Sequence, residues 1–200
     1  MVAARRTYGP GDALVVVDVQ NDFAHPDGSL FVQGGDAVVA RVNDEVDAAH
    51  DADAVVVYTQ DWHPPDTPHF ADRGGTWPVH CVRDTWGAEL HADLHVVDGA
   101  PVVHKGTGDE DGYSGFTVRD LASDTDVRTE LDPILREAGV ERVVVVGIAT
   151  DVCVKATVLD AVELGYDTTV LADATAAVDL EEGDRDRALA EMAAAGATVS

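Results

Sequence analysis

The sequence has few cysteines and lysines and no long apolar run, and each scarcity excludes a class of protein. Two cysteines, Cys81 and Cys153, among 200 residues are too few for a disulfide-stabilised scaffold. No apolar run approaches the roughly 20 residues of a membrane-spanning helix. Residues 1–10 also lack the apolar core of a signal peptide. We therefore expect a cytoplasmic protein with no membrane partner.

Positive charge is scarce as well. Lysine and arginine total 13 against 38 acidic residues, which gives a formal net charge of -25. Such a surface repels nucleic acids and anionic membranes, so we expect no nucleic-acid partner. Lys105 and Lys155 are the only lysines. Acidic, lysine-poor surfaces resemble those of salt-adapted proteins, because high salt screens the self-repulsion. The composition thus suggests a halophilic, haloarchaeal source.

Valine-rich runs alternate with amphipathic stretches along the chain. The pattern predicts strands at 13–19, 54–59, 100–104, 142–147, 168–171 and 197–199, and helices at 36–50, 132–138, 151–164 and 183–195. Parallel strands with helical crossovers form a three-layer αβα sandwich, so we expect a Rossmann-like, mostly parallel sheet of about six strands. No repeat or linker interrupts the pattern, and residues 1–200 are predicted to form a single domain.

Two long segments fall outside this alternation. Residues 60–88 form a loop rich in Pro, Gly, Trp and His, and loops of this length inside compact domains are usually functional. The second segment, 105–129, is acidic and rich in glycine, and the acidic stretch 123–130 is interpreted as surface.

Ionisable side chains follow four of the predicted strands. They are Asp18, the pair Asp61 and His63, Lys105 and Cys153, at the ends of the first four strands in chain order. In parallel α/β sheets, ligands bind outside the carboxyl ends of the strands, near the point where the strand order reverses. The spacing therefore predicts that these residues share one site.

Cys153 is the candidate nucleophile. It opens a predicted helix, where the dipole and free N–H groups favour a thiolate, although a lone cysteine there is more often a core residue. Asp18 and Lys105 add the partners that a nucleophile requires. Asp18 would accept the thiol proton and return it to leaving ammonia, and Lys105 would orient Asp18 and stabilise the thiolate charge. Taken singly, each could instead be a strand-end residue reaching solvent.

Asp61, His63 and His80 are candidate metal ligands. Asp61 and His63 stand two residues apart on one side of an extended strand end, and His80 can approach from across the loop. Two histidines and one carboxylate suit zinc, iron or manganese. On spacing alone, solvated loop histidines are the alternative.

Five segments together resemble nicotinamidases of the isochorismatase-like cysteine hydrolase superfamily. Running in order over residues 14–174, they read VVVDVQNDF, TQDWHP, GTWPVHCVRDTWGAEL, VHKGTG with DGYSGF, and VVVGIATDVCVKATVLDAVELGY. The resemblance implies the isochorismatase-like fold. It also implies a catalytic triad of Asp18, Lys105 and Cys153 and the metal ligands Asp61, His63 and His80.

The same resemblance implies the pocket residues. The pair Ile148-Ala149 corresponds to the family's non-proline cis peptide, which would let the N–H groups of Ala149 and Cys153 form an oxyanion hole and would place the pair beside the substrate. Phe23 and Trp77 match aromatics that sandwich a pyridine ring whose nitrogen reaches the metal. Plain core packing is the alternative for both aromatics.

One departure from the family pattern concerns His69. Many relatives carry a His and then a Ser-Phe pair after DWHP, whereas residues 64–70 here read PPDTPHF and place His69 at the serine position. His69 is a candidate fourth metal ligand, bound directly or through water, and a plain loop position is the alternative.

The resemblance implies deamidation of nicotinamide to nicotinate and ammonia through a Cys153 thioester. Pyrazinamide would be a second substrate. The resemblance also implies a role in NAD salvage and pyridine nucleotide biosynthesis. It further implies one divalent metal, zinc with iron or manganese as alternatives, and a homo-oligomer. Two other functions stay open: hydrolysis of another small amide, and metal binding without catalysis. The metal triad beside Cys153 argues against the first, and the complete catalytic triad argues against the second.

Overall fold

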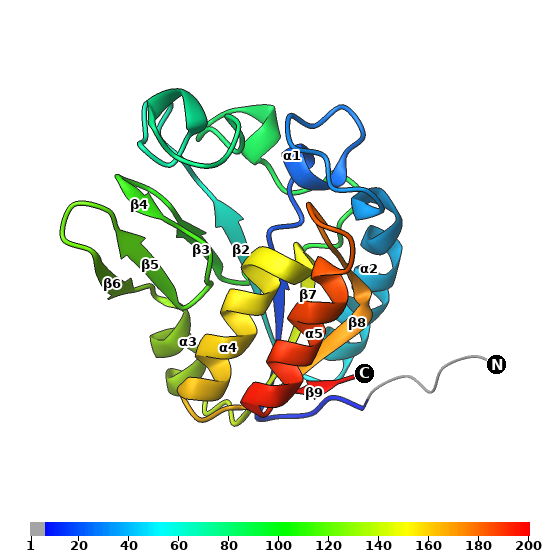
Figure 1. Cartoon of the computed structure of the whole chain (residues 1–200). Coiled ribbons are helices and arrows are strands. Elements are labelled where there is room, and N and C mark those ends of the chain that lie inside the picture. The colour runs from blue at the N-terminus through cyan, green and yellow to red at the C-terminus, as the bar shows by residue number, and fades with distance from the viewer. Residues whose placement is uncertain (1–6) are drawn as a thin grey trace.

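A six-stranded parallel sheet forms the centre of the molecule in a computed structural model that describes residues 7–200 (Figure 1). Every neighbouring pair of its strands is parallel. In sheet order the strands are β3 (Val102–Lys105), β2 (Val55–Asp61), β1 (Asp12–Val17), β7 (Arg142–Ile148), β8 (Asp167–Ala176) and β9 (Thr198–Val199). The predicted sheet is confirmed, with strand ends shifted by a few residues.

Helices cover both faces of this sheet and complete the predicted three-layer sandwich (Figure 1). Alternate β1 residues serve the two layers. Leu14 and Val16 pack on the side of α2 (Gly35–Asp51), and Val15 and Val17 pack on the side of α3 (Leu131–Glu137), α4 (Lys155–Glu163) and α5 (Asp184–Ala195). No helix within residues 7–200 has the length and apolar character to cross a bilayer.

The strand order reverses between β1 and β7. From β1 the chain moves outward to β2 and β3, and it then returns to place β7 on the other side of β1. The register aligns Val17 with Thr59 and Gly147, and Asp61 with Lys105. The predicted polar residues therefore leave the sheet side by side at this reversal, where α/β sheets bind ligands.

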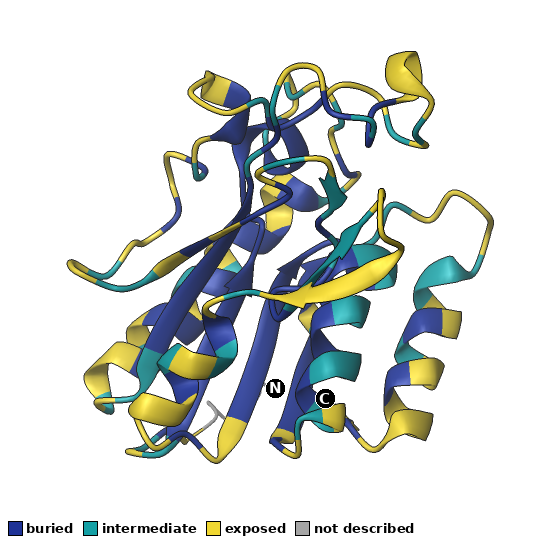
Figure 2. Cartoon of the chain, turned by 90° about the vertical axis from the view of Figure 1, so that its left-hand side faces the viewer, coloured by how far each residue is buried: buried dark blue, intermediate teal, exposed yellow. Residues whose placement is uncertain are grey.

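Part of the 105–129 segment is regular, contrary to the sequence interpretation. It contains a small antiparallel sheet of β4 (Glu110–Asp111), β5 (Thr117–Asp120) and β6 (Thr125–Arg128). These strands are four residues or shorter and lack apolar alternation, so periodicity did not reveal them. All of β6 is exposed, which agrees with a surface position for the acidic stretch, whereas the central strands are buried (Figure 2).

Two other segments also differ from the predicted pattern. The long loop is interrupted by short 3-10 turns, Ala71–Arg73 and Trp86–Ala88, and a four-residue helix, α1 (Asn21–Ala24), follows β1. The predicted helix 151–164 begins with a π-helical segment, Thr150–Val154, that carries Cys153. Such π-turns widen a helix locally and occur often at functional sites.

Packing of α3 against the sheet can be tested with a leucine pair. Leu135 is completely buried among the α3–α5 core residues, so Leu135→Ala is expected to lower the free energy of unfolding by about 2–5 kcal/mol. Leu180→Ala, at a 75 % exposed position, should change it by less than about 0.5 kcal/mol. Urea unfolding at one fixed salt concentration measures both. Equal losses for the two variants would contradict the position of α3.

Candidate active site

Lys105 lies at the centre of a buried cluster at the carboxyl edge of the sheet. Its Nζ is 2.7 Å from Asp18 Oδ2, contacts Asp61 Oδ1, and lies 3.6 Å from Cys153 Sγ. All four side chains are buried. Thr59 donates a 2.6 Å hydrogen bond to Asp18 Oδ1 and fixes that carboxylate. The structure thus brings the predicted Asp18, Lys105 and Cys153 together and adds Asp61, which sequence reasoning had placed in the metal group alone.

Burial governs the protonation of this cluster. It raises the pKa of Asp18 to about 6 against the opposing charge of Lys105, and it raises the pKa of the Cys153 thiol well above its usual range. Burial would also raise the pKa of Asp61, but Lys105 together with His63 and His80 lowers it well below the ordinary value. Burial thus opposes the helix-stabilised thiolate that the sequence predicted, and that thiolate stays a prediction. A neutral thiol lies beside a carboxylate that can take its proton.

Three histidine rings converge beside Asp61. The Nε2 atoms of His63 and His80 each lie 3.7 Å from Asp61 Oδ2. The His69 ring stacks on His63 with centroids 4.5 Å apart. His63, His69 and His80 each contribute one ring nitrogen to a group whose members lie within 4.8 Å of one another. The predicted residues Asp61, His63 and His80 are therefore gathered in one place, and His69 lies with them rather than in an outer loop position.

The hydrogen bonds of the rings leave Nε2 free for a ligand. His63 Nδ1 lies 3.0 Å from Gly106 O, and His80 Nδ1 lies 2.7 Å from Pro78 O. A carbonyl oxygen only accepts, so each Nδ1 donates, and in the neutral ring Nε2 then carries the lone pair. The Nδ1 of His69 faces Asp111 Oδ1 at 2.5 Å. Gly106 is required here, because at its φ of 65° a Cβ would stand 2.3 Å from the His63 ring.

This donor set fits a divalent metal. His63 Nε2 is buried without a hydrogen-bond partner among the described residues, a costly arrangement unless a ligand satisfies the nitrogen. Three imidazole nitrogens and one carboxylate oxygen are the ligands that zinc and the other first-row divalent metals prefer.

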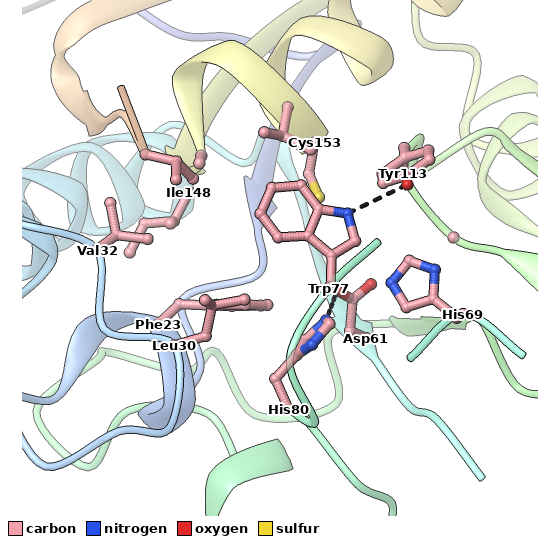
Figure 3. Close-up of a pocket in the computed structure, with 14 residues that line it drawn as sticks. Phe23, Leu30, Val32, Asp61, His69, Trp77, His80, Tyr113, Ile148 and Cys153 are labelled. Carbon is pink, nitrogen blue, oxygen red and sulfur yellow. Dashed lines mark hydrogen bonds and ion pairs between the residues drawn. The ribbon is translucent and has the colours of Figure 1, made fainter. Parts of the chain in front are cut away.

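A narrow pocket connects the histidine cluster with Cys153 (Figure 3). It encloses about 410 Å³ of empty space, counting its open mouth. His69 and His80 stand at one end and Cys153 at the other, and a carboxylate oxygen of Asp61 lies within 4.8 Å of Cys153 Sγ. The predicted substrate residues all line it, namely Phe23, Trp77, Ile148 and Ala149. The peptide bond between Ile148 and Ala149 is cis, as the resemblance implied.

Sequence reasoning missed part of the pocket wall. Tyr113 accepts a 3.1 Å hydrogen bond from Trp77 Nε1 through its hydroxyl, which links two loops at the pocket (Figure 3). Tyr113 belongs to the recognised DGYSGF segment, so that motif could have pointed to it. The other missed wall residues are Gly112, in the same segment, and four apolar positions with no distinguishing pattern: Leu30, Val32, Val152 and Val178.

Comparisons with known proteins give a consistent result. The family model described as Isochorismatase domain matches residues 12–200. A nicotinamidase of Escherichia coli K12 is 38% identical over 206 residues, which cover 95% of this chain and 94% of the relative.

Two solved structures share the fold over nearly their whole length. A pyrazinamidase of Pyrococcus horikoshii in complex with zinc has a TM-score of 0.85 at 39% identity, with 96% of this chain and 99% of that chain covered. PnC1 from L. infantum in complex with nicotinate has a TM-score of 0.86 at 37% identity, with 98% and 95% covered.

The two lysines of the chain provide a test of the buried cluster. Lys105→Met leaves Asp18 and Asp61 buried without their counter-charge, so the free energy of unfolding should fall by about 3–5 kcal/mol. Lys155 is only partly buried and pairs with the exposed Glu191. Lys155→Met should therefore lower the free energy of unfolding by less than about 1 kcal/mol. Chemical unfolding with a chelator present keeps metal from masking the difference. Equal stability of the two variants would contradict the cluster.

Proposed function

Because the chain belongs to the isochorismatase family, we propose that it is a metal-dependent cysteine amidohydrolase that converts nicotinamide and water to nicotinate and ammonia. The observation that carries this proposal is the pocket itself, with a buried thiol, carboxylate and ammonium at one end and a histidine cluster at the other. The nicotinamidase relative and the nicotinate complex of PnC1 support the choice of substrate.

In the proposed first half-reaction, Cys153 Sγ attacks the amide carbon while its proton passes to Asp18. The raised pKa of Asp18 suits a group that accepts a proton and then returns it. The N–H groups of Ala149 and Cys153 would stabilise the oxyanion. Asp18 then protonates the amide nitrogen, the carbon–nitrogen bond breaks, and ammonia leaves behind a thioester on Cys153.

The second half-reaction releases the acid. Asp18 takes a proton from a water molecule, whose oxygen attacks the thioester carbon. The carbon–sulfur bond breaks, and Asp18 returns the proton to Cys153. Lys105 holds Asp18 in place throughout and offsets negative charge on oxygen and sulfur, since its Nζ is within 3.6 Å of Sγ.

We propose Asp61, His63, His80 and His69 as the ligands of one divalent metal, zinc with iron or manganese as alternatives. When bound, the metal would orient the pyridine nitrogen as a Lewis acid. The zinc complex of the related pyrazinamidase supports the choice of zinc. Phe23 and Trp77 would sandwich the ring between aromatic faces. Pyrazinamide, with the same ring geometry, is the proposed second substrate.

Several conclusions from the sequence stay predictions. They are the single-domain organisation, the cytoplasmic location, the homo-oligomeric assembly, the role in NAD salvage and the salt-adapted source. Hydrolysis of another small amide and metal binding without catalysis stay as the alternative functions, and the two experiments that follow separate them from nicotinamide deamidation.

The two cysteines form a matched pair for testing the nucleophile. Both are free and buried, but Cys153 lines the pocket, whereas Cys81 Sγ only approaches Gly87 O at 3.9 Å. Cys153→Ala is expected to lower ammonia release from nicotinamide by at least about 10⁴-fold, and Cys81→Ala by less than about threefold. A coupled ammonia assay at high salt measures both. Full activity of Cys153→Ala would exclude the thioester route.

Removal of metal tests the other end of the pocket. Dialysis against a strong chelator should abolish nicotinamide turnover, and zinc, iron or manganese should restore it. Urea unfolding of the dialysed protein checks that the fold survives metal removal. Turnover that survives complete metal removal would eliminate the proposed role of the four ligands. A metal-loaded protein that turns over no amide would favour the binding-only alternative.

A further inference from the structure

The third histidine of the cluster is oriented differently from the other two. His63 and His80 direct Nδ1 to the neutral carbonyl oxygens of Gly106 and Pro78. His69 instead directs Nδ1 to the carboxylate of Asp111, at 2.5 Å. With Nδ1 held by Asp111, Nε2 is the nitrogen of His69 that remains for a ligand, and one nitrogen of His69 lies within 4.8 Å of a nitrogen of each of His63 and His80.

Asp111 reaches His69 from a separate part of the fold. It belongs to β4, whose register with β5 pairs Asp111 with Arg119. The turn before β4 is closed by Glu110, which accepts hydrogen bonds from Thr107 and from the N–H of Gly108. The small antiparallel sheet therefore contacts the histidine cluster through Asp111, which is 42 residues from His69 in the sequence.

Chemistry distinguishes a carboxylate from a carbonyl as a partner of imidazole. A charged acceptor on Nδ1–H holds the ring more firmly and makes Nε2 a stronger donor to a metal than a neutral acceptor does. The side chain of Asp111 is 23% exposed and that of His69 only 3%, so the hydrogen bond lies mostly out of water, where it is stronger.

We propose that Asp111 is a positioning residue that orients His69 and strengthens its Nε2 as a metal ligand. The β4–β6 sheet is then a support for the metal site, since it carries the carboxylate that fixes one ligand. This inference rests on the metal site of the proposed function and adds a residue outside the ligand set. It assigns Asp111 no contact with metal or substrate.

Zinc affinity measures the proposed effect without any assay of activity. Competition with a chromophoric chelator at fixed salt and pH gives the zinc dissociation constant of each variant. Asp111→Ala should weaken zinc binding by about 10–100-fold, and Asp111→Asn, which keeps an acceptor oxygen but loses the charge, should weaken it less. The control is Asp126→Asn on the exposed β6, where the carboxylate pairs with Arg119, and it should change affinity by less than about twofold.

A double-mutant cycle separates positioning from general support of the fold. In a His69→Ala background, Asp111→Ala should cause no further loss of zinc affinity, because Asp111 acts through the His69 ring. Additive losses would overturn the proposal, and so would unchanged affinity in both Asp111 variants. Urea unfolding curves identify any variant whose loss reflects unfolding, and Asp111→Asn, close in shape to the native residue, guards against that outcome.

The outcomes also separate this inference from the proposed function. If the wild-type protein fails to bind zinc, iron or manganese, the proposed metal site is wrong and the role of Asp111 is wrong with it. If the wild type binds metal and the Asp111 variants bind it equally well, only the inference about Asp111 is overturned.

Discussion

A single buried ammonium joins the two ends of the pocket. Lys105 contacts Asp18, which belongs with the thiol, and Asp61, which belongs with the histidines. Burying any of these charges alone would cost several kcal/mol, so each carboxylate depends on the lysine and the lysine on both carboxylates. The geometry of the nucleophile and the geometry of the histidine cluster are therefore not independent. The parallel register that sets Asp61 beside Lys105 makes this connection possible.

The arrangement of the acceptor oxygens explains why this position carries a lysine in a chain that has only two. Three oxygens, from Asp18, Asp61 and the Gly112 carbonyl, converge on Lys105 Nζ. An ammonium offers three donors around one atom, whereas a guanidinium spreads five donors over a rigid plane. A compact charge also leaves room for Cys153 Sγ at 3.6 Å. Arginine, which supplies most of the positive charge elsewhere, would not match this arrangement.

Sequence reasoning predicted that the candidate site residues lie together, because their positions depend on long periodic elements. Valine-rich strands are recognisable, and their carboxyl ends meet by topology, so Asp18, Lys105 and Cys153 could be placed together before any coordinates. Burial and short-strand pairing could not be predicted in this way. The protonation of Cys153 depends on complete desolvation, and the contact of His69 with Asp111 depends on a two-residue strand whose partners lie further along the chain.

In the proposed reaction the nucleophile starts as a neutral thiol beside a carboxylate that can take its proton. Burial raises the proton affinity of both Cys153 and Asp18, and Lys105 opposes the shift in each. The proton therefore rests on sulfur, and a thiol that carries its proton is a poor target for oxidants. In the proposed reaction this proton would move to Asp18 as the sulfur–carbon bond forms, and negative charge would build up on the carbonyl oxygen. On this proposed route the arrival of the amide, rather than a pre-formed thiolate, would start the reaction.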